Sequence, residues 1–410
     1  MIEGSRRSRH LTAAEAAARL GVSRNSLYAY VSRGRIHAES DPRNPRASRY
    51  LAVDVERLRD QKEARLHPEA AARKTLAWGT PVLGSSVTLI DGGRLYYRGH
   101  DALALAQHAQ FEDVVRLLWS PDLTLDLRAA PLSGTSRKAL RQLRTLPTWN
   151  RMQAILPFAA ADDDAAFDIG AAACAVTAWG IVNLLTVAAT LQTSHTSQSI
   201  AARLAQGWHV RARAAVRLLD LALILCADHE LNVSAFAVRV VASTRTSLYD
   251  VVAAGLAALR GPRHGGFTAH VESLLDESGA ASGVRRAIVE RLRRGESIPG
   301  FGHPLYPDGD PRARAILAAV EQTFPSSKAT AFLRAGRHAG RTLLGDHPNL
   351  DYALVVLRRA LGLPRGSALV LFALGRTVGW MAHAMEQYQL DQLIRPRAAY
   401  TGPMPARRRT

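Results

Sequence analysis

Most of the chain carries apolar residues three and four positions apart. This spacing is typical of helices that bury one face against a core. The segments with this pattern are rich in Ala and Leu and cover residues 102–119, 169–191, 214–227, 248–260, 312–321, 352–361 and 366–385. The sequence contains no repeat of fixed period. The pattern therefore predicts a mainly helical protein.

Two segments depart from the helical pattern. Apolar runs at residues 87–90 and 95–97 flank an Asp-Gly-Gly turn at 91–93. A glycine-rich turn between two short apolar runs predicts a β-hairpin. The Ala- and Asp-rich stretch 159–168 predicts a surface loop.

The N-terminal part of the chain predicts a set of short helices. Thr12 followed by Glu15 is a capping box, which begins a first helix. Gly21 marks a tight turn, and a second helix is expected over residues 24–33. A third helix is expected over 53–65. Helix, glycine turn and helix in this order form the helix-turn-helix pattern.

The stretch LTAAEAAARLGVSRNSLYAYVSRGRI resembles DNA-binding domains of the MerR and excisionase type. The resemblance implies that the second helix enters the major groove and that the loop 41–49, rich in Pro and Arg, forms a wing. It places Arg24, Asn25 and Tyr28 against bases, and Arg33, Arg35, Arg43, Arg46 and Arg49 against phosphates. The alternative is a helical module for protein contacts whose arginines are merely solvated.

The composition indicates a folded globular protein. Hydrophobic residues make up 47% and charged residues 21% of the 410 residues, which suggests two or three domains. Cys174 and Cys226 cannot form a disulfide framework, and the first ten residues lack the apolar stretch of a secretory signal. A cytoplasmic location is therefore expected.

The charge balance favours anionic partners. Lys and Arg number 53 against 35 Asp and Glu, a net charge of +18, and nearly all the basic residues are Arg. Arg binds carboxylates and phosphates through two parallel hydrogen bonds, so acidic ligands or nucleic acid fit this balance. A compositional bias of the source organism is the alternative explanation.

One uncharged segment is long enough to cross a bilayer. It covers residues 169–194, is rich in Ala, Gly and Thr, and contains Asn183 and Gln192. Because these residues contribute little transfer free energy, we expect a buried, close-packed helix rather than a membrane span, and no membrane partner.

Three histidines are candidates for chemistry on a ligand. His229, His264 and His303 each lie at or near a predicted helix boundary. Gly265 follows His264 and Gly302 precedes His303, and glycine lets the backbone approach a ligand closely. Their spacing fits no zinc signature, so no metal is expected.

Arginines and one carboxylate complete the candidate set. Arg312, Arg376 and Arg395 are suited to neutralise a small polyanion. Asp351 follows Pro348 and precedes an apolar run, a place where burial would tune its proton affinity. Histidine donors with a carboxylate base form a set for removing a proton beside a carbonyl.

Each of these residues also has a structural explanation. A histidine beside glycine is often a loop residue with one hydrogen bond. Asp351 is also a candidate helix N-cap, and Arg376 could pair with a buried acid. The combination in one chain favours the functional interpretation.

Several motifs together resemble the citrate synthases and 2-methylcitrate synthases. The hairpin IDGGRLYYRGHD is followed by FEDVVRLLW, ADHELN, GPRHGGF, GFGHPLYPDGDPRA, GRTVGW and RPRAAYTG, in that family's order. The resemblance covers about residues 80–403. It implies a two-domain helical enzyme that works as a homodimer, with its site in the cleft between the domains.

The resemblance also sets the expected domains. Residues 1–66 form a helix-turn-helix domain, 67–80 a linker and 81–403 the synthase region. Within the synthase region a small domain is inserted at roughly 262–365. The implied reaction condenses an acyl-CoA with oxaloacetate and then hydrolyses the thioester. Coenzyme A serves as a cosubstrate, and no permanently bound cofactor is implied.

Site roles follow from the resemblance residue by residue. Asp351 removes the proton from the acyl group, His264 stabilises the enol, and His303 polarises the ketone of oxaloacetate. His229, Arg312 and Arg376 hold oxaloacetate, and Arg395 reaches the site of the partner subunit. Such a site requires enolate hydrogen bonds and exclusion of water, because a thioester α-proton is very weakly acidic.

The sequence departs from the family pattern near the site. Cys226 replaces a frequent histidine, Pro304 and Leu305 replace an Arg-Val pair, and residues 352–355 replace an aromatic pair and Ser-Gly. These changes leave the choice between acetyl-CoA, propionyl-CoA and longer acyl groups open. Two further functions stay open: a regulator whose synthase body only senses metabolites, and an enzyme whose N-terminal module mediates assembly.

Overall fold

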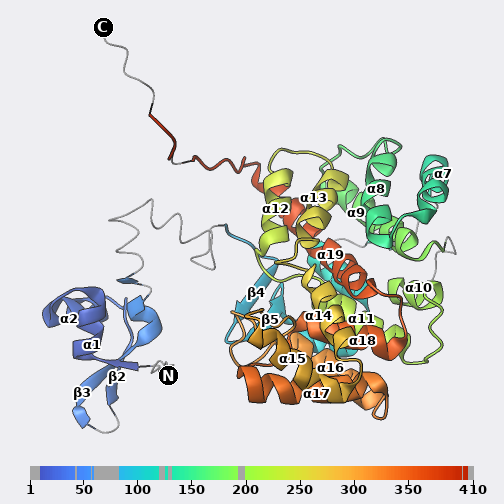
Figure 1. Cartoon of the computed structure of the whole chain (residues 1–410). Helices are drawn as coiled ribbons and strands as arrows, with labels where there is room; N and C mark the ends of the chain where they lie inside the picture. Colours follow the sequence, from blue (N-terminus) through green and yellow to red (C-terminus); the bar gives the residue numbers. More distant parts are fainter. Residues whose placement is uncertain are drawn as a thin grey trace. The chain divides into compact units, whose positions relative to one another are not determined.

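The computed structural model describes residues 10–41, 44–56, 58–59, 83–119, 125–127, 132–192, 199–398 and 400–404. The chain divides into two compact units, Met1–Gly84 and Ser85–Thr410, which are treated separately below (Figure 1). The predicted linker 67–80 lies outside the described residues.

The N-terminal unit combines short helices with a three-stranded sheet. Its elements are β1 (His10–Thr12), α1 (Ala13–Leu20), α2 (Arg24–Ser32), β2 (Ala38–Asp41) and β3 (Asn44–Leu51). Thr12 and Glu15 form the predicted capping box, and Gly21 ends α1 in the left-handed conformation at φ 58°. Ser23 caps α2. The predicted helix-turn-helix is thus confirmed.

Of the predicted loop 41–49, residues 41 and 44–49 are instead strand residues. β3 lies between β1 and β2 and pairs antiparallel with both. Tyr50 and Ile36 pack with Leu27 in a small core. Burial of these side chains favours extended pairing where the Pro and Arg content suggested irregular chain. Of the predicted helix 53–65, residues 53–56 and 58–59 are helical and the rest lies outside the described residues.

The second unit begins with the predicted hairpin. β4 (Thr88–Asp91) pairs with β5 (Arg94–Tyr97), and β5 pairs with the short β6 (His100–Asp101). The turn residues Gly92 and Gly93 have φ values of 56° and 76°. Two successive positive φ angles explain why glycine stands at both positions.

The described elements after β6 are helical, which confirms the predicted fold class. The helices are α5 (Ala102–His108), α6 (Phe111–Trp119), α7 (Gly134–Gln142), α8 (Thr148–Ala160), α9 (Ala171–Thr190), α10 (Ile200–Gly207), α11 (Ala215–Cys226), α12 (Val233–Ala242), α13 (Leu248–Leu259), α14 (Phe267–Glu277), α15 (Val284–Arg293), α16 (Pro311–Thr323), α17 (Lys328–Ala339), α18 (Leu350–Leu361) and α19 (Ser367–Leu390). The single helix predicted over 102–119 is two helices, because Ala109 leaves the helical conformation and Asp220 accepts the freed Phe111 N–H at 3.2 Å.

Among the residues that the structure describes, two helices meet the length and hydropathy of a membrane span. They are α9 and α19, and 72% and 94% of their most apolar windows are buried inside the protein. Such burial is typical of core helices. The sequence pattern identified only the first of them, because Arg376 interrupts the uncharged run in α19.

Helix α19 runs through the helical body and packs against α6, α9, α11, α12, α13 and α18 (Figure 1). Its close contact with the end of α11 depends on glycine. A Cβ atom on Gly375 would lie 2.6 Å from the Leu223 carbonyl oxygen, and one on Gly379 would clash with the carbonyl oxygen of Ala227. This close approach places the polar face of α19 beside the loop that follows α11.

Candidate functional site

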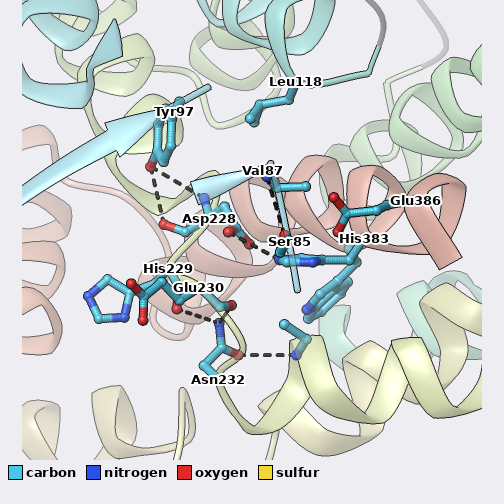
Figure 2. A network of polar contacts seen from close by, with 12 residues as sticks. Ser85, Val87, Tyr97, Leu118, Asp228, His229, Glu230, Asn232, His383 and Glu386 are labelled. Carbon is cyan, nitrogen blue, oxygen red and sulfur yellow. Dashed lines mark hydrogen bonds and ion pairs between the residues drawn. The ribbon is translucent and has the colours of Figure 1, made fainter. Parts of the chain in front are cut away.

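The loop after α11 is held by a network of polar contacts (Figure 2). The Tyr97 hydroxyl lies 2.9 Å from the Ile224 carbonyl oxygen, and the buried His383 Nε2 lies 3.2 Å from Asp228 Oδ2. Glu230 accepts the Ile90 N–H at 2.9 Å. Figure 2 shows the His229 ring pointing away from Asp228 and His383. The hairpin, α11 and α19 therefore fix the backbone from which His229 projects.

The buried His229 side chain meets a second segment, residues 303–306. Its Nε2 atom lies 2.9 Å from the Tyr306 hydroxyl oxygen. The His229 ring lies 5.2 Å from the His303 ring, and the His303 and Tyr306 rings are 4.9 Å apart, centroid to centroid. Two of the predicted histidines are thus neighbours, although 74 positions separate them in the numbering.

His264 approaches from a third segment, between α13 and α14. Its Nε2 atom lies 2.8 Å from the Ser234 hydroxyl oxygen, which also accepts the Trp380 Nε1–H at 3.1 Å. Its ring centroid lies 6.2 Å from that of Phe372. His264 is therefore held between α12 and α19, at the base of the loop GPRHGGF.

Two arginines with little exposed surface line the same region. Arg312 forms a two-point ion pair with Asp310, with Nε–Oδ1 at 3.0 Å and Nη2–Oδ2 at 2.8 Å. The Arg376 Nε–H is donated to the Cys226 carbonyl oxygen at 2.9 Å, and its Nη2 is buried without a hydrogen-bond partner among the described residues. The buried Asp228 carboxylate also interacts with the Arg376 charge, so the structural alternative of a buried acid partner stays open.

Asp351 lies in the first turn of α18. Asn349, not Asp351, is the N-cap of this helix, which removes the capping explanation for Asp351. The Asn349 N–H is donated to the Gly300 carbonyl oxygen at 2.9 Å, and the Gly302 N–H to that of His347. These bonds join the loop that carries His303 to the start of α18. The Oδ1 atom of Asp351 is buried and has no hydrogen-bond partner among the described residues.

Burial sets the protonation states of the three histidines and of Asp351. It lowers the pKa of His264 and of His303 to about 4, with Arg376 and Arg312 respectively as the next causes, and lowers that of His229 well below its usual value. All three imidazoles are therefore neutral near pH 7. Burial also raises the pKa of Asp351 to about 7, an effect that Arg312 opposes and Asp310 reinforces.

The described part of the second unit thus brings together six predicted residues: His229, His264, His303, Arg312, Arg376 and Asp351. The charges of Arg312 and Arg376 both act on His229, and that of Arg312 also acts on Asp351. Arg395 does not join them, because it is exposed in the segment after α19. Among the residues that the structure describes, no group of three or more His, Cys, Asp or Glu could hold a metal ion.

In the N-terminal unit, the residues predicted to read bases are exposed. Arg24, Asn25 and Tyr28 lie on α2 and are exposed, whereas Leu27 on the same helix is buried. Of the predicted phosphate contacts, Arg33 and Arg35 are exposed, whereas Arg49 is half-buried with its Nε 3.8 Å from Asp41 Oδ1. Arg43 and the side chain of Arg46 lie outside the described residues.

Sequence reasoning missed several side chains of the cluster. They are Ser234, Tyr306, Asp310, Phe372 and Trp380. Asp310 had a local signal, since it precedes Pro311 and caps α16 in the pattern of a helix start. Phe372 and Trp380 had none, because the sequence pattern does not distinguish a buried ring in a helix from any other core residue, and Tyr306 lies in the loop before α16.

Comparison with known proteins agrees with this arrangement. A family described as citrate synthase, C-terminal domain, matches residues 76–397, and a helix-turn-helix domain matches residues 11–63. The chain therefore belongs to the citrate synthase family and carries an N-terminal helix-turn-helix domain.

Two of the relatives are named as different synthases. Citrate synthase 2 of Bacillus subtilis is 36% identical over 191 residues, which is 46% of this chain and 51% of that protein. The 2-methylcitrate synthase of Mycobacterium tuberculosis is 29% identical over 334 residues, 75% of this chain and 84% of that protein. The chain spans about half the length of the first of these relatives.

Solved structures cover a larger part of the chain. The citrate synthase of Thermotoga maritima aligns with a TM-score of 0.65 and 29% identity, over 80% of this chain and 95% of that one. The citrate synthase of Thermoplasma acidophilum, solved with carboxymethyl coenzyme A and oxaloacetate, aligns with a TM-score of 0.65 and 26% identity, over 80% and 96%.

Proposed function

We propose that this protein is an acyltransferase that condenses a short acyl-CoA with oxaloacetate and releases citrate, or its alkylated homologue, and CoA. The observation that carries this proposal is the pairing of Asp351, a carboxyl with a pKa raised to about 7, with neutral histidines and two buried arginines. This set matches a reaction that removes a weakly acidic proton and stabilises the resulting enolate.

Asp351 takes the role of the base. Its carboxylate accepts the α-proton of the thioester, and its free Oδ1 atom leaves an acceptor for that proton. The raised pKa makes the carboxylate a stronger base than an exposed one. His264 donates a hydrogen bond to the oxygen of the enolate that forms. The enolate α-carbon then attacks the ketone carbon of oxaloacetate, whose oxygen is polarised by a hydrogen bond from His303 as it becomes an alkoxide. Water afterwards hydrolyses the citryl thioester.

Oxaloacetate is held by His229, Arg312 and Arg376. Guanidinium groups match the geometry of its two carboxylates, and burial strengthens each charge-assisted hydrogen bond. The unpartnered Nη2 of Arg376 supplies a donor of the kind that a carboxylate would satisfy. The match between the two carboxylates of oxaloacetate and these buried donors supports the binding roles of His229, Arg312 and Arg376.

The acyl group is short, and two relatives suggest the choices. One is named a citrate synthase and another a 2-methylcitrate synthase. The decisive experiment measures CoA release from acetyl-CoA, propionyl-CoA and butyryl-CoA, each with and without oxaloacetate. We expect release only with oxaloacetate. If no thioester gives oxaloacetate-dependent CoA release, the proposal is wrong and a metabolite-sensing regulator becomes the better function.

The protein works as a homodimer in which Arg395 completes the site of the partner. Arg395 is exposed and lies after α19, where the Ile394 N–H is donated to the Ser243 hydroxyl oxygen at 3.1 Å. A cation anchored at its base but exposed at its tip suits a contact with another subunit.

Mixed dimers test this arrangement. Arg395→Ala and Asp351→Asn should each be inactive alone, since each removes one part of every site. Dimers reassembled from both variants contain one intact site, so about a quarter of wild-type CoA release is expected in an equimolar mixture. No recovery of activity in confirmed mixed dimers would contradict a contribution of Arg395 across the interface.

We further propose that the N-terminal unit binds duplex DNA, with α2 in the major groove and the β2–β3 hairpin as the wing. Arg24 and Asn25 are exposed at the start of α2, where recognition helices contact base edges. Tyr28 is 52% exposed one turn later, where its ring is available for contact with a base. The arginine excess supplies contacts to phosphates.

A double variant on α2 tests DNA binding. Arg24→Ala with Asn25→Ala should weaken binding to genomic fragments at low salt by about tenfold, and should reduce the salt slope by about one charge. The matched control is Arg19→Ala, since Arg19 already pairs with Glu56 at 3.5 Å. Its binding should stay within about twofold of wild type. Equal binding by both variants, or no binding by the wild type, would contradict the proposal.

A further inference from the structure

Asp310 and Arg312 form a buried two-point ion pair at the candidate site. Both side chains are buried, at 2% and 3% exposed. Asp310 receives the Nε–H and one Nη2–H of Arg312, and also the Arg312 backbone N–H at 3.0 Å. The Asp310 carboxylate therefore caps α16 and also binds the Arg312 guanidinium in the first turn of that helix.

This pair determines which donors of Arg312 remain. A guanidinium has five N–H donors in a rigid plane. The Nε–H and one Nη2–H, which form the side-on edge of the guanidinium, are donated to Asp310. The end-on edge, formed by Nη1 and the second Nη2–H, therefore remains available to bind a ligand. The Arg312 plane also lies against the Tyr306 ring, with Cζ 5.6 Å from the ring centroid. The guanidinium can thus neither rotate nor withdraw without breaking both contacts.

We propose that Asp310 is a positioning residue, which clamps Arg312 so that only its end-on edge faces oxaloacetate. This inference rests on the proposed condensation, and it assigns a role outside the residues that contact the substrates. Asp310 does not touch a reacting atom. It acts through Arg312 by contact, and on Asp351 and His303 through its charge.

The electrostatic part follows from the positions of these groups. Asp310 raises the pKa of Asp351, after burial, and raises that of His303, whose main shift is downward by burial. Since the base must be ionised to accept a proton, kcat/KM for acyl-CoA should fall below about pH 7 in the wild type. Removing the Asp310 charge makes ionisation of Asp351 easier. The Arg312 charge, no longer neutralised by Asp310, adds to the same effect. The acid limb of the profile should therefore move to lower pH.

The variant Asp310→Asn tests this, because asparagine keeps an acceptor for the α16 cap but loses the charge. We expect the KM for oxaloacetate to rise about tenfold, with a smaller fall in kcat, and the acid limb to shift down by roughly one pH unit. Asp310→Ser, which also keeps a cap, replaces it if the asparagine variant does not fold.

The matched control is Glu272→Gln. Glu272 is also 2% exposed and forms a two-point ion pair, with Arg358 on α18, at 3.2 and 3.0 Å. It should lose comparable thermal stability but keep the wild-type acid limb and a KM for oxaloacetate within about threefold. Identical behaviour of the two variants would overturn the inference.

Calorimetric titration of oxaloacetate separates this inference from the proposed function. If the wild type releases no CoA, condensation fails, but weaker oxaloacetate binding by Asp310→Asn than by Glu272→Gln still supports the clamp on Arg312. Equal affinities of these variants, or no binding of oxaloacetate to the wild type, would reject the clamp.

Discussion

Replacing Asp351 by asparagine is expected to reduce CoA release by about a thousandfold or more while oxaloacetate still binds. Asparagine has nearly the same shape but cannot accept the α-proton, and a positioned general base contributes roughly two to four orders of magnitude in rate. Steady-state CoA release and calorimetric binding of oxaloacetate measure the two parts. Retained turnover would remove Asp351 from the mechanism.

The stability of the same variant gives an independent result. A carboxyl whose pKa is raised from 3.8 to about 7 by folding loses stability as the pH rises between these values, because the folded state opposes ionisation. Asparagine does not ionise, so the variant does not lose stability in this way. The melting temperature of Asp351→Asn relative to wild type should therefore increase from pH 4 to pH 7 and stay constant above.

The matched control is Asp220→Asn. Asp220 is also a buried carboxyl, and burial raises its pKa to about 6, but it accepts the Phe111 N–H between α6 and α11, away from the cluster. Its asparagine variant keeps that acceptor and should retain CoA release within about threefold. A similar loss in both variants would indicate damage to the fold rather than loss of a base.

Adding a single methyl group at Gly379 is expected to destabilise the second unit by roughly 3 kcal/mol. The new Cβ would clash with the Ala227 carbonyl oxygen and lie 2.5 Å from Asp228 Oδ1. Since the first of these atoms belongs to the backbone, the clash is relieved only if α19 moves away from α11. That movement would separate Arg376 from Cys226 and from the His229 loop.

Thermal unfolding and CoA release check this prediction together. We expect Gly379→Ala to melt roughly 5–10 °C lower and to lose most activity. Gly180→Ala is the control, because Gly180 lies inside α9 and a Cβ there would meet nothing within 4 Å. That variant should be unchanged or slightly more stable, since alanine is the better helix former. Equal melting temperatures of the two variants would show that α19 and α11 tolerate a wider spacing.

Local signals predicted the elements where they are strong. The capping box at Thr12 and Glu15 and the two glycines at 92 and 93 each satisfy a particular backbone geometry, so the sequence alone located a helix start and a hairpin turn. Shorter amphipathic helices such as α7, α14 and α15 were missed, because their apolar positions are few and interrupted by charge.

The site was predictable as a set of residues but not as a geometry. The motifs around His264, His303 and Asp351 supplied side chains that the fold brings into one cluster, because each stands beside glycine or a helix start in a family pattern. Their partners were not predictable. Ser234, Trp380 and Asp310 look locally like a helix residue, a core ring and a cap, and only packing turns them toward His264 and Arg312.

The pattern of apolar, polar and glycine positions predicted the helical class and the helix-turn-helix, and motifs such as GPRHGGF and GFGHPLYPDGDPRA carried the resemblance to the family. Only the fold determines which donors lack a partner, which carboxyl has a pKa near neutral pH, and that residues 41 and 44–49 pair as strands. The physical reason is that desolvation and neighbouring charge depend on contacts between distant segments, above all those around α19, and no local pattern records them.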